Sequence, residues 1–240
     1  MSSRILIFDN DGTLVPSHLV ANPAIQEAFA RFSEERRLGL PAPSDARIRE
    51  LTGQPGDAFY RALLPERLQH LAAELRNFCL DREVAEMRRA ATFYPGIEEM
   101  LHACRARGDR LVLASHGGER YIGAVAERLR YADLFDRVYH HGFEGMQEKT
   151  EMARRARSEL GPGRPAVFAG DRRADLLAAR AAGTRFVGCL YGYGSREELE
   201  GADALAATPA GLAAILLNGE EAEGPGVRPG EDPAISEGGA

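Results

Sequence analysis

The chain has 240 residues, of which 44% are hydrophobic and 28% are charged, so it has enough apolar residues for a folded core. Its formal net charge is −6 at pH 7, but the last 23 residues hold six acids and one base and thus most of that charge. The nearly neutral remainder gives no electrostatic reason to expect nucleic acid as a partner. The segment 218–240 is rich in Gly, Pro and Glu and is predicted to be a disordered acidic tail.

The cysteines and the lack of long apolar runs indicate a cytoplasmic protein. Cys79, Cys104 and Cys189 are odd in number, far apart and without metal-ligand spacing, so we expect them to be reduced. No apolar stretch approaches the length that spans a bilayer, and the N-terminus lacks the pattern of a signal peptide. We therefore expect no membrane partner; the oligomeric state is left open.

Short apolar runs alternate with longer segments of helical spacing over most of the chain. The runs predict strands at 5–8, 111–114, 138–139, 166–169 and 186–190. The longer segments predict helices at 97–107, 119–130, 150–160 and 174–182. Near-continuous apolar strands that alternate with helices indicate an α/β fold, with a doubly wound, Rossmann-like parallel sheet covered on both faces.

The segment between the first two predicted strands has only helical patterns. Helices are expected at 22–37, 44–51, 57–64 and 65–87. Asn22 is expected to cap the first of them, with Pro23 in its first turn, and Ser44 to cap the second. Residues 16–94 are therefore predicted to be an inserted, all-helical cap domain, which returns to the core at a turn signal near Pro95. The core domain would comprise 1–15 and 95–217.

Two aspartates follow the first predicted strand, in the sequence FDNDGTLV. Asp9 and Asp11 are two residues apart in extended chain, so both can face the same side, and Gly12 and Thr13 then let the chain turn. One interpretation makes Asp9 a carboxylate nucleophile that attacks phosphorus, with Asp11 as the general acid and later the base. The alternative is an ordinary turn, because Asp, Asn and Gly are common turn residues.

Two further aspartates follow another predicted strand, in VFAGDRRAD. Asp171 comes at the end of that strand and Asp175 one helical turn later. Because carboxylate oxygens suit magnesium, we expect Asp9, the backbone carbonyl of Asp11 and Asp171 to be its protein ligands. Asp175 would orient Lys149 or a metal-bound water at the same site. Its alternative is an acid that the helix dipole favours in a first turn.

Lys149 is the one lysine among the 30 lysine and arginine residues of the chain. Lysine offers a compact point charge, whereas arginine offers a broad planar fork. Two like charges about 4 Å apart cost roughly 4 kcal/mol at an effective dielectric constant near 20, so carboxylates gathered around a phosphate need a close cation. We therefore expect Lys149 to hold the phosphate and to steady the nucleophile. The alternative is a solvated lysine at a helix start.

Ser115 ends the second predicted strand, in LVLASHGG, and is followed by two glycines and a helix. A hydroxyl and glycines before a helix N-terminus suit a phosphate oxygen, and parallel sheets place their ligand crevice at this edge. Ser115 and Gly117 are therefore candidates for substrate contacts, and Thr13 is a third. His116 is a fourth candidate, although a partly exposed loop histidine is its more ordinary interpretation.

Substrate specificity is expected to lie in the cap. Gly53 belongs to a loop that could reach the crevice when the cap closes, and closure of such a lid excludes water. Arg47, Arg49 and Arg61 are candidate contacts for an anionic leaving group. The alternative for each arginine is an ordinary position on a helix surface.

Taken in order, the four motifs resemble those of the haloacid dehalogenase superfamily. DNDGTLV is similar to its first motif, Ser115 to its second, Lys149 to its third and GDRRAD to its fourth, within a resemblance that covers residues 4–217. The place of the helical insertion resembles that of the family's cap. The stretches AAGTRFVGCLYGYGS and GADALAATPAGL are similar to the phosphoglycolate phosphatase branch. The resemblance implies a Mg2+-dependent phosphatase of a small, phosphoglycolate-like phosphomonoester.

Some departures from the family pattern, and some other activities, bear on this interpretation. Pro16 stands where relatives often have an acid, His116 where they have Asn and Thr150 where they have Pro. Asp11 argues against dehalogenation, and the lack of lysine in the insertion argues against phosphonate hydrolysis through a Schiff base. A phosphotransferase or phosphomutase of the β-phosphoglucomutase type stays open, because it shares the nucleophile and the acid. A non-catalytic binding module would be expected to lose those groups.

Overall fold

One parallel sheet forms the centre of the molecule. The computed structural model describes residues 3–219, so the tail predicted at 218–240 lies almost wholly outside the described residues. Within them the strands are ordered β3-β2-β1-β4-β5-β6, and each neighbouring pair is parallel. The strands are β1 Ile5–Phe8, β2 Arg110–Gly118, β3 Arg137–His141, β4 Ala166–Gly170, β5 Arg185–Cys189 and β6 Ala204–Ala206. The doubly wound sheet predicted from the sequence is thus confirmed, and β6 is an edge strand that the sequence did not reveal.

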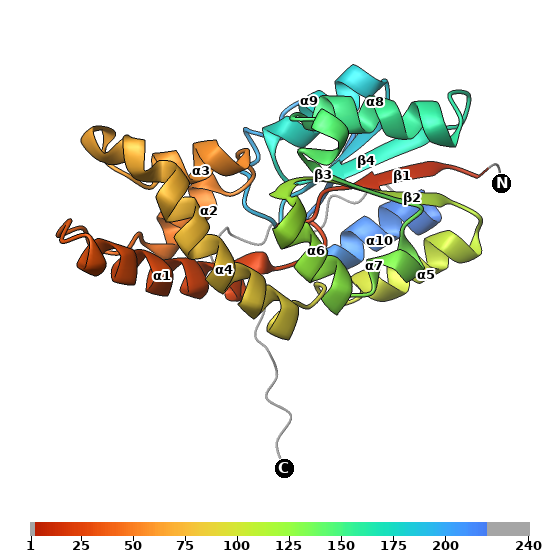
Figure 1. The fold of residues 1–240 in the computed structure, drawn as a ribbon. Coiled ribbons are helices and arrows are strands. Elements are labelled where there is room, and N and C mark those ends of the chain that lie inside the picture. The colour runs from red at the N-terminus through yellow and green to blue at the C-terminus, as the bar shows by residue number, and fades with distance from the viewer. Residues whose placement is uncertain (1–2, 220–240) are drawn as a thin grey trace, which may run out of the picture.

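Helices cover both faces of this sheet (Figure 1). One face carries α5 Ile97–Ala106, α6 Glu119–Arg128, α7 Tyr131–Leu134 and α10 Pro209–Asn218. The other carries α8 Lys149–Leu160 and α9 Arg173–Ala182, and the short 3-10 helix η3 Phe143–Gly145 follows β3. In β1, Leu6 and Phe8 belong to the apolar cluster of the first face, and Ile5 and Ile7 to that of the second. A strand that is apolar at every position is covered twice because its side chains alternate between faces.

An all-helical cap is inserted after β1. It comprises η1 Ser17–Leu19, α1 Ala21–Glu35, α2 Asp45–Leu51, α3 Gly56–Ala62, η2 Glu66–Leu71 and α4 Ala72–Ala90. Helices α1 and α3 pack against α4 over an apolar cluster that includes Phe29, Phe32 and Leu75, and α4 also contacts α6 of the core. In Figure 1 the cap lies beside the end of the sheet, as the red to gold part of the ribbon. The boundaries of the cap, 16 and 94, stay predictions.

The first cap helix begins differently from the sequence prediction. Helix α1 starts at Ala21, and Asn22 lies inside its first turn instead of capping it. The Asn22 amide donates a 2.6 Å hydrogen bond to Oδ1 of Asp45 at the start of α2. Ser44 caps α2 as predicted, by accepting the backbone N–H of Arg47. The polar side chain of Asn22 therefore joins two helices rather than satisfying the end of its own.

Among residues 3–219, no helix combines the length and the apolar character that a membrane crossing requires.

Cys79, Cys104 and Cys189 are all buried and free, so they act as small apolar side chains in the clusters where they lie.

Candidate active site

Asp9 and Asp171 lie where the strand order of the sheet reverses. Strand β1 pairs with β2 on one side and with β4 on the other, and Phe8 is the register partner of Ala169. Asp9 follows β1 directly and donates its backbone N–H to the carbonyl oxygen of Ala169, at 3.0 Å. Asp171 follows β4 directly. Open parallel sheets bind ligands at such a reversal, outside the carboxyl ends of the strands.

Three buried carboxylates form a compact group beyond these strand ends. Oxygen atoms of Asp9, Asp171 and Asp175 lie within 4.8 Å of one another, and each residue is at most 3% exposed. Burial raises the pKa of Asp9 well above its usual range, and the charge of Asp175 adds to that shift. Burial and Asp175 also raise the pKa of Asp171 to about 7. Carboxylates held this close need cations to stay ionised, and their oxygen atoms suit a hard divalent ion such as Mg2+.

The ammonium of Lys149 lies between two of these carboxylates. Its Nζ is 2.7 Å from Oδ1 of Asp9 and 2.7 Å from Oδ1 of Asp175, and Lys149 is 2% exposed. Burial lowers the pKa of Lys149, but Asp175 and Asp9 together raise it by more, so the ammonium stays charged. Removal of one partner from a buried ion pair leaves an uncompensated charge. The one lysine of the chain thus stands where two carboxylates require a compact cation.

Asp175 is held by its neighbours on both sides. Its Oδ2 accepts the backbone N–H of Arg172 at 2.9 Å, which satisfies a donor at the start of α9. Gly170 leaves the room that Asp175 occupies, because a Cβ on Gly170 would lie 2.4 Å from the Cβ of Asp175. One carboxylate oxygen of Asp175 therefore serves the helix, and the other faces Lys149.

Asp11 lies apart from the three grouped carboxylates. Its Oδ1 accepts a 2.7 Å hydrogen bond from the Tyr121 hydroxyl and a 3.1 Å bond from the side-chain amide of Asn10. Burial raises the pKa of Asp11, and these hydrogen bonds lower it in part. The side chain of Asp11 is not in the group that could hold a metal ion among the described residues. A contribution of Asp11 to a metal site would come from its backbone carbonyl, as the sequence analysis expects.

The turn after Asp11 is fitted closely to Asp171. Gly12 has a φ of +82°, and a Cβ on Gly12 would lie 2.4 Å from Oδ2 of Asp171. Thr13 is buried, and its Oγ1 donates to Oδ1 of Asp171 at 3.3 Å. Thr13 is not among the described residues that line the cavity between core and cap. The sequence predicted a substrate contact for Thr13, whereas the structure directs its hydroxyl to a carboxylate.

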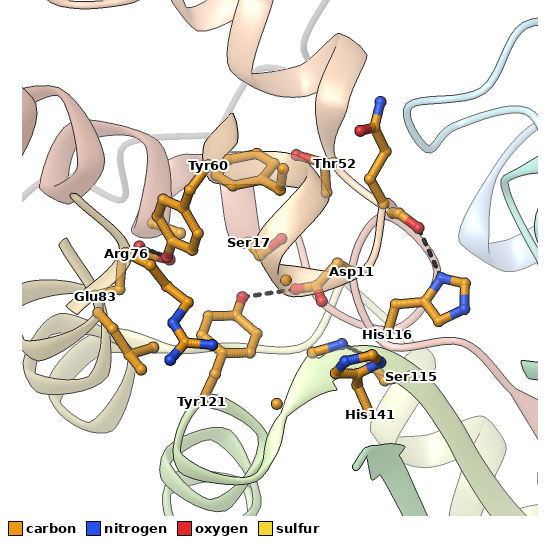
Figure 2. A pocket seen from close by; sticks show the side chains of 18 of the residues that line it. Asp11, Ser17, Thr52, Tyr60, Arg76, Glu83, Ser115, His116, Tyr121 and His141 are labelled. Carbon is orange, nitrogen blue, oxygen red and sulfur yellow. Dashed lines mark hydrogen bonds between the residues drawn. The ribbon is translucent and has the colours of Figure 1, made fainter. Parts of the chain in front are cut away.

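A cavity of about 210 Å³ lies between the core and the cap (Figure 2). The predicted site residues that line it are Asp9, Asp11, Ser115, His116, Gly117 and Lys149 from the core and Gly53 from the cap. Asp171 and Asp175 lie beside Asp9 and are fully buried. The fold therefore brings residues at or after the ends of β1, β2 and β3, together with one cap loop, to a single cavity, and Asp171 after β4 lies directly beside them.

Ser115 is buried within β2, which continues to Gly118 instead of ending at the serine. The register of β2 against β3 shifts between Ser115 and Gly118. The Oγ of Ser115 accepts the backbone N–H of Gly117 at 3.0 Å. Because this contact uses Oγ as an acceptor, the hydroxyl proton is free to be donated into the cavity that Ser115 lines.

His116 is buried within β2, so its interpretation as a partly exposed loop histidine is wrong. It is 6% exposed, and its Nδ1 lies 2.8 Å from the backbone oxygen of Gly53 in the cap. A carbonyl oxygen only accepts hydrogen bonds, so Nδ1 carries the proton. Burial and the charge of Lys149 lower the pKa of His116 to about 4, so that it is neutral at pH 7. A neutral His116 thus fastens a cap loop to the core.

The cap arginines that the sequence analysis singled out do not face the cavity. Arg47, Arg49 and Arg61 are absent from its described lining, and Arg47 and Arg49 pair with acids of their own helix. The arginine that lines the cavity is Arg76, on α4. The sequence predicts a helix there, but its pattern does not define which side of that helix faces the core.

Glu83, also on α4, is a second cavity residue that sequence reasoning missed. The sequence contains a pattern that points to Glu83. Leu75, Cys79, Glu83 and Met87 recur every four residues and are all buried, so an acid interrupts an apolar stripe of the helix. An acid in such a position needs a partner or a function.

Tyr193, in the loop after β5, contacts both the group of three buried carboxylates and the first residues of the cap. Its backbone N–H donates to Oδ2 of Asp171 at 2.6 Å. Its hydroxyl oxygen lies 2.8 Å from Oγ of Ser17 and accepts the backbone N–H of His18 at 3.0 Å. One tyrosine therefore contacts both a candidate metal ligand and the segment where the chain enters the cap.

Comparisons with known proteins agree with this geometry. The family model of haloacid dehalogenase-like hydrolases matches residues 6–180, and a model of HAD-hydrolase-like proteins matches residues 148–216. The chain therefore belongs to the haloacid dehalogenase-like hydrolases.

The relatives also indicate the kind of hydrolase. The chain is 27% identical over 198 residues to a phosphoglycolate phosphatase of Pseudomonas putida, which covers 79% of this chain and 70% of the relative. It is 28% identical over 203 residues to a 5'-nucleotidase of Pseudomonas aeruginosa, with coverage of 81% and 86%. The crystal structure of CbbY from Rhodobacter sphaeroides in complex with phosphate has a TM-score of 0.69 and 26% identity, with coverage of 88% and 96%. The chain is accordingly a phosphatase of the phosphoglycolate phosphatase branch.

Proposed function

We propose that this phosphatase is Mg2+-dependent and hydrolyses a small phosphomonoester through an aspartyl-phosphate on Asp9. The supporting observation is that Asp9 and Asp11 line one cavity but have different surroundings. Asp9 contacts the ammonium of Lys149 and belongs to the group of carboxylates that could hold a metal ion. The side chain of Asp11 lies outside that group and accepts hydrogen bonds from Tyr121 and Asn10. One carboxylate is therefore placed beside cations that favour its ionised form, while the other is buried among neutral groups. A nucleophile and a general acid require this division of roles.

The metal site would be built from Asp9, Asp171 and the backbone carbonyl of Asp11, with Asp175 beside them. When bound there, Mg2+ supplies positive charge that offsets the phosphate and the carboxylates. Support comes from the balance of charge: the group of three carboxylates has one ammonium, Lys149, which pairs with Asp9 and Asp175. The pKa values of Asp9 and Asp171 are raised by burial and by the nearby charge of Asp175. A further cation would relieve this repulsion.

The reaction follows from the placement of the two aspartates. An oxygen of Asp9 attacks phosphorus while the bond from phosphorus to the leaving oxygen breaks, and Asp11 donates its proton to that oxygen. Water then attacks the phosphorus of the aspartyl-phosphate, Asp11 takes a proton from it, and the bond to Asp9 breaks to release phosphate. Lys149 and the Ser115 hydroxyl would bind the phosphoryl oxygens while negative charge develops on them.

A set of assays with an aryl phosphate tests this function. Purified protein with Mg2+ is expected to hydrolyse it, and EDTA is expected to stop turnover until Mg2+ is restored. Asp9→Asn should abolish turnover, whereas Asp133→Asn, the same change at an exposed acid on α7, should not alter it. Mass spectrometry of Asp11→Asn should detect a phosphoryl group on the peptide that contains Asp9. Turnover by Asp9→Asn at the wild-type rate would exclude the covalent mechanism.

The named activities of the relatives differ in the leaving group of the phosphomonoester. One relative is named a phosphoglycolate phosphatase and another a 5'-nucleotidase, so the matches allow both a small anionic leaving group and a large uncharged one. The choice between them depends on the cap side of the cavity.

A further inference from the structure

Arg76 and Glu83 form the cap side of the cavity. In Figure 2 they lie with Tyr60 on one side of Asp11, and His116 lies on the other. They are seven residues apart on α4, which is about two helical turns, so they face the same side of the helix. A leaving alcohol that receives its proton from Asp11 would extend into this part of the cavity.

Glu83 presents a carboxyl group to the cavity from a buried position. It is 5% exposed, and the Tyr60 hydroxyl donates a hydrogen bond to its Oε1. Burial raises the pKa of Glu83 to about 7. A carboxyl in an apolar stripe is costly to bury, and perturbed carboxyls of this kind concentrate at functional sites. With Oε1 engaged by Tyr60, Oε2 is the oxygen that can accept a hydrogen bond from a ligand.

The charged residues that line the cavity leave no surplus of positive charge. The Arg76 guanidinium pairs with Asp57 at 2.8 Å. Lys149 lies between two carboxylates of the core, and the lowered pKa of His116 keeps it neutral at pH 7. Each lysine or arginine of the described lining is thus matched by an acid, and Glu83 adds a further acid when it ionises. A leaving group with its own carboxylate would be repelled here.

The remaining features of this side favour a ring with hydroxyl groups. Arg76 lines the cavity, and its Nε is a buried donor without a hydrogen-bond partner among the described residues, so a hydroxyl group bound beside Arg76 would satisfy it. Ile25, Phe59 and Leu80 supply apolar walls on the same side. Apolar walls with a few polar groups that fix orientation are typical of sites for small molecules that bury most of their surface.

We propose that the leaving alcohol is an uncharged, hydroxylated ring, such as a sugar or the ribose of a nucleoside, which binds Glu83 and Arg76 through its hydroxyl groups. Glu83 then discriminates against substrates with a second anionic group, phosphoglycolate among them. The inference rests on the proposed phosphatase function at the same cavity, and it assigns Glu83 and Arg76 to substrate specificity.

The test compares kcat/KM for four substrates in the presence of Mg2+: a ribonucleoside 5'-monophosphate, a sugar monophosphate, phosphoglycolate and an aryl phosphate. The wild type is expected to favour the nucleotide or the sugar phosphate over phosphoglycolate by at least about tenfold, and the better of these two identifies the ring. A preference for phosphoglycolate would overturn the inference and leave the proposed function intact. Failure with all four substrates, the aryl phosphate included, would count against the proposed function itself.

Two variants test the part played by charge. Glu83→Gln keeps an acceptor for Tyr60 and removes the negative charge. The ratio of kcat/KM for phosphoglycolate to kcat/KM for the better of the nucleotide and the sugar phosphate should therefore rise at least about fivefold. Glu86→Gln is the matched control, because Glu86 lies on the same helix and pairs with Arg82 and Arg89. An unchanged ratio in folded Glu83→Gln would overturn the inference.

If Glu83→Gln does not fold, a change at the exposed Asp57 decides the question. Asp57→Asn frees Arg76 from its acid and should raise the same ratio, because the cavity then gains an unmatched cation. Asp81→Asn is its control, as an exposed acid on α4 that pairs with Arg120. A ratio equal to that of the wild type in Asp57→Asn would overturn the inference.

Discussion

The Tyr121 hydroxyl donates a 2.7 Å hydrogen bond to Oδ1 of Asp11, across 110 residues of sequence. Tyr121 lies on α6, which follows the second strand of the sheet, whereas Asp11 follows the first. Burial raises the pKa of Asp11, and the bond from Tyr121 opposes that shift because it stabilises the ionised form. The pair therefore sets the proton affinity of the proposed general acid.

Tyr121→Phe is expected to shift the pH–rate profile to higher pH. Loss of the hydroxyl removes a stabilising contact of the ionised carboxylate, so the pKa of Asp11 rises and Asp11 acts as a base only at higher pH. A hydrogen bond worth about 1 kcal/mol corresponds to a shift of about 0.7 pH units. The measurement is kcat from pH 5 to 9, with Tyr139→Phe as control because that hydroxyl binds Glu159 on the outside of the core. A profile that does not move would show that Tyr121 does not control this proton.

Lys149→Arg is expected to lower kcat at least tenfold, which corresponds to about 1.4 kcal/mol of barrier. The ammonium lies 2.7 Å from two carboxylates in a position that is 2% exposed. A guanidinium is larger and planar, so it cannot make both contacts without displacing one carboxylate. Arg154→Lys, an exchange on the same helix but on its surface, should leave kcat unchanged. A rate for Lys149→Arg near that of the wild type would show that positive charge alone suffices there.

The core half of the site could be predicted because its positions follow from local patterns. Asp9 and Asp171 each come directly after an apolar run, and the carboxyl ends of parallel strands meet at one edge of a sheet. The three-residue β6 was not predicted, because a run as short as Ala204–Ala206 carries no periodicity. Pairing with β5 rather than local composition makes it a strand.

The cap half of the site could not be predicted, because it depends on how two domains dock. His116 meets Gly53 across 63 residues, and no spacing rule relates the two. Sequence periodicity predicted the helix that carries Glu83. It did not define which way the buried side of that helix would face relative to the cavity. Asn22 shows the same limit: its pattern matches a cap residue, but an acid on the neighbouring helix gives it a better partner.

His116→Ala is expected to loosen the contact between the cap and the core. The bond from Nδ1 to Gly53 joins the cap loop to the core, and the buried ring also fills space beside the cavity. We expect KM for a phosphomonoester to rise about fivefold or more, which corresponds to about 1 kcal/mol, and proteolysis near Gly53 to become faster. His102→Ala, an exposed position on α5, is the control. Unchanged proteolysis and KM would show that other contacts hold the cap.

Glu83→Gln is expected to make the protein more stable at pH 8 but not at pH 4. Burial raises the pKa of Glu83 from 4.5 to about 7, and the charge of Asp11 adds to the shift, while the Tyr60 hydrogen bond opposes it. The folded state therefore binds a proton more tightly than the unfolded state. The stability from this proton is fully present below pH 4.5 and is lost as the pH rises to about 7.

The loss can amount to at most about 3 kcal/mol, because each pKa unit corresponds to about 1.4 kcal/mol. Glutamine resembles the protonated acid and cannot ionise, so the variant should lose less stability than the wild type between pH 4 and pH 8. Urea unfolding at several pH values measures the difference, with Glu86→Gln as the control, because Glu86 is an acid on the same helix that pairs with Arg82 and Arg89. Parallel pH curves for wild type and Glu83→Gln would mean that the cap carboxyl ionises at its ordinary pH, and that the cavity holds a carboxylate rather than a carboxylic acid throughout the neutral range.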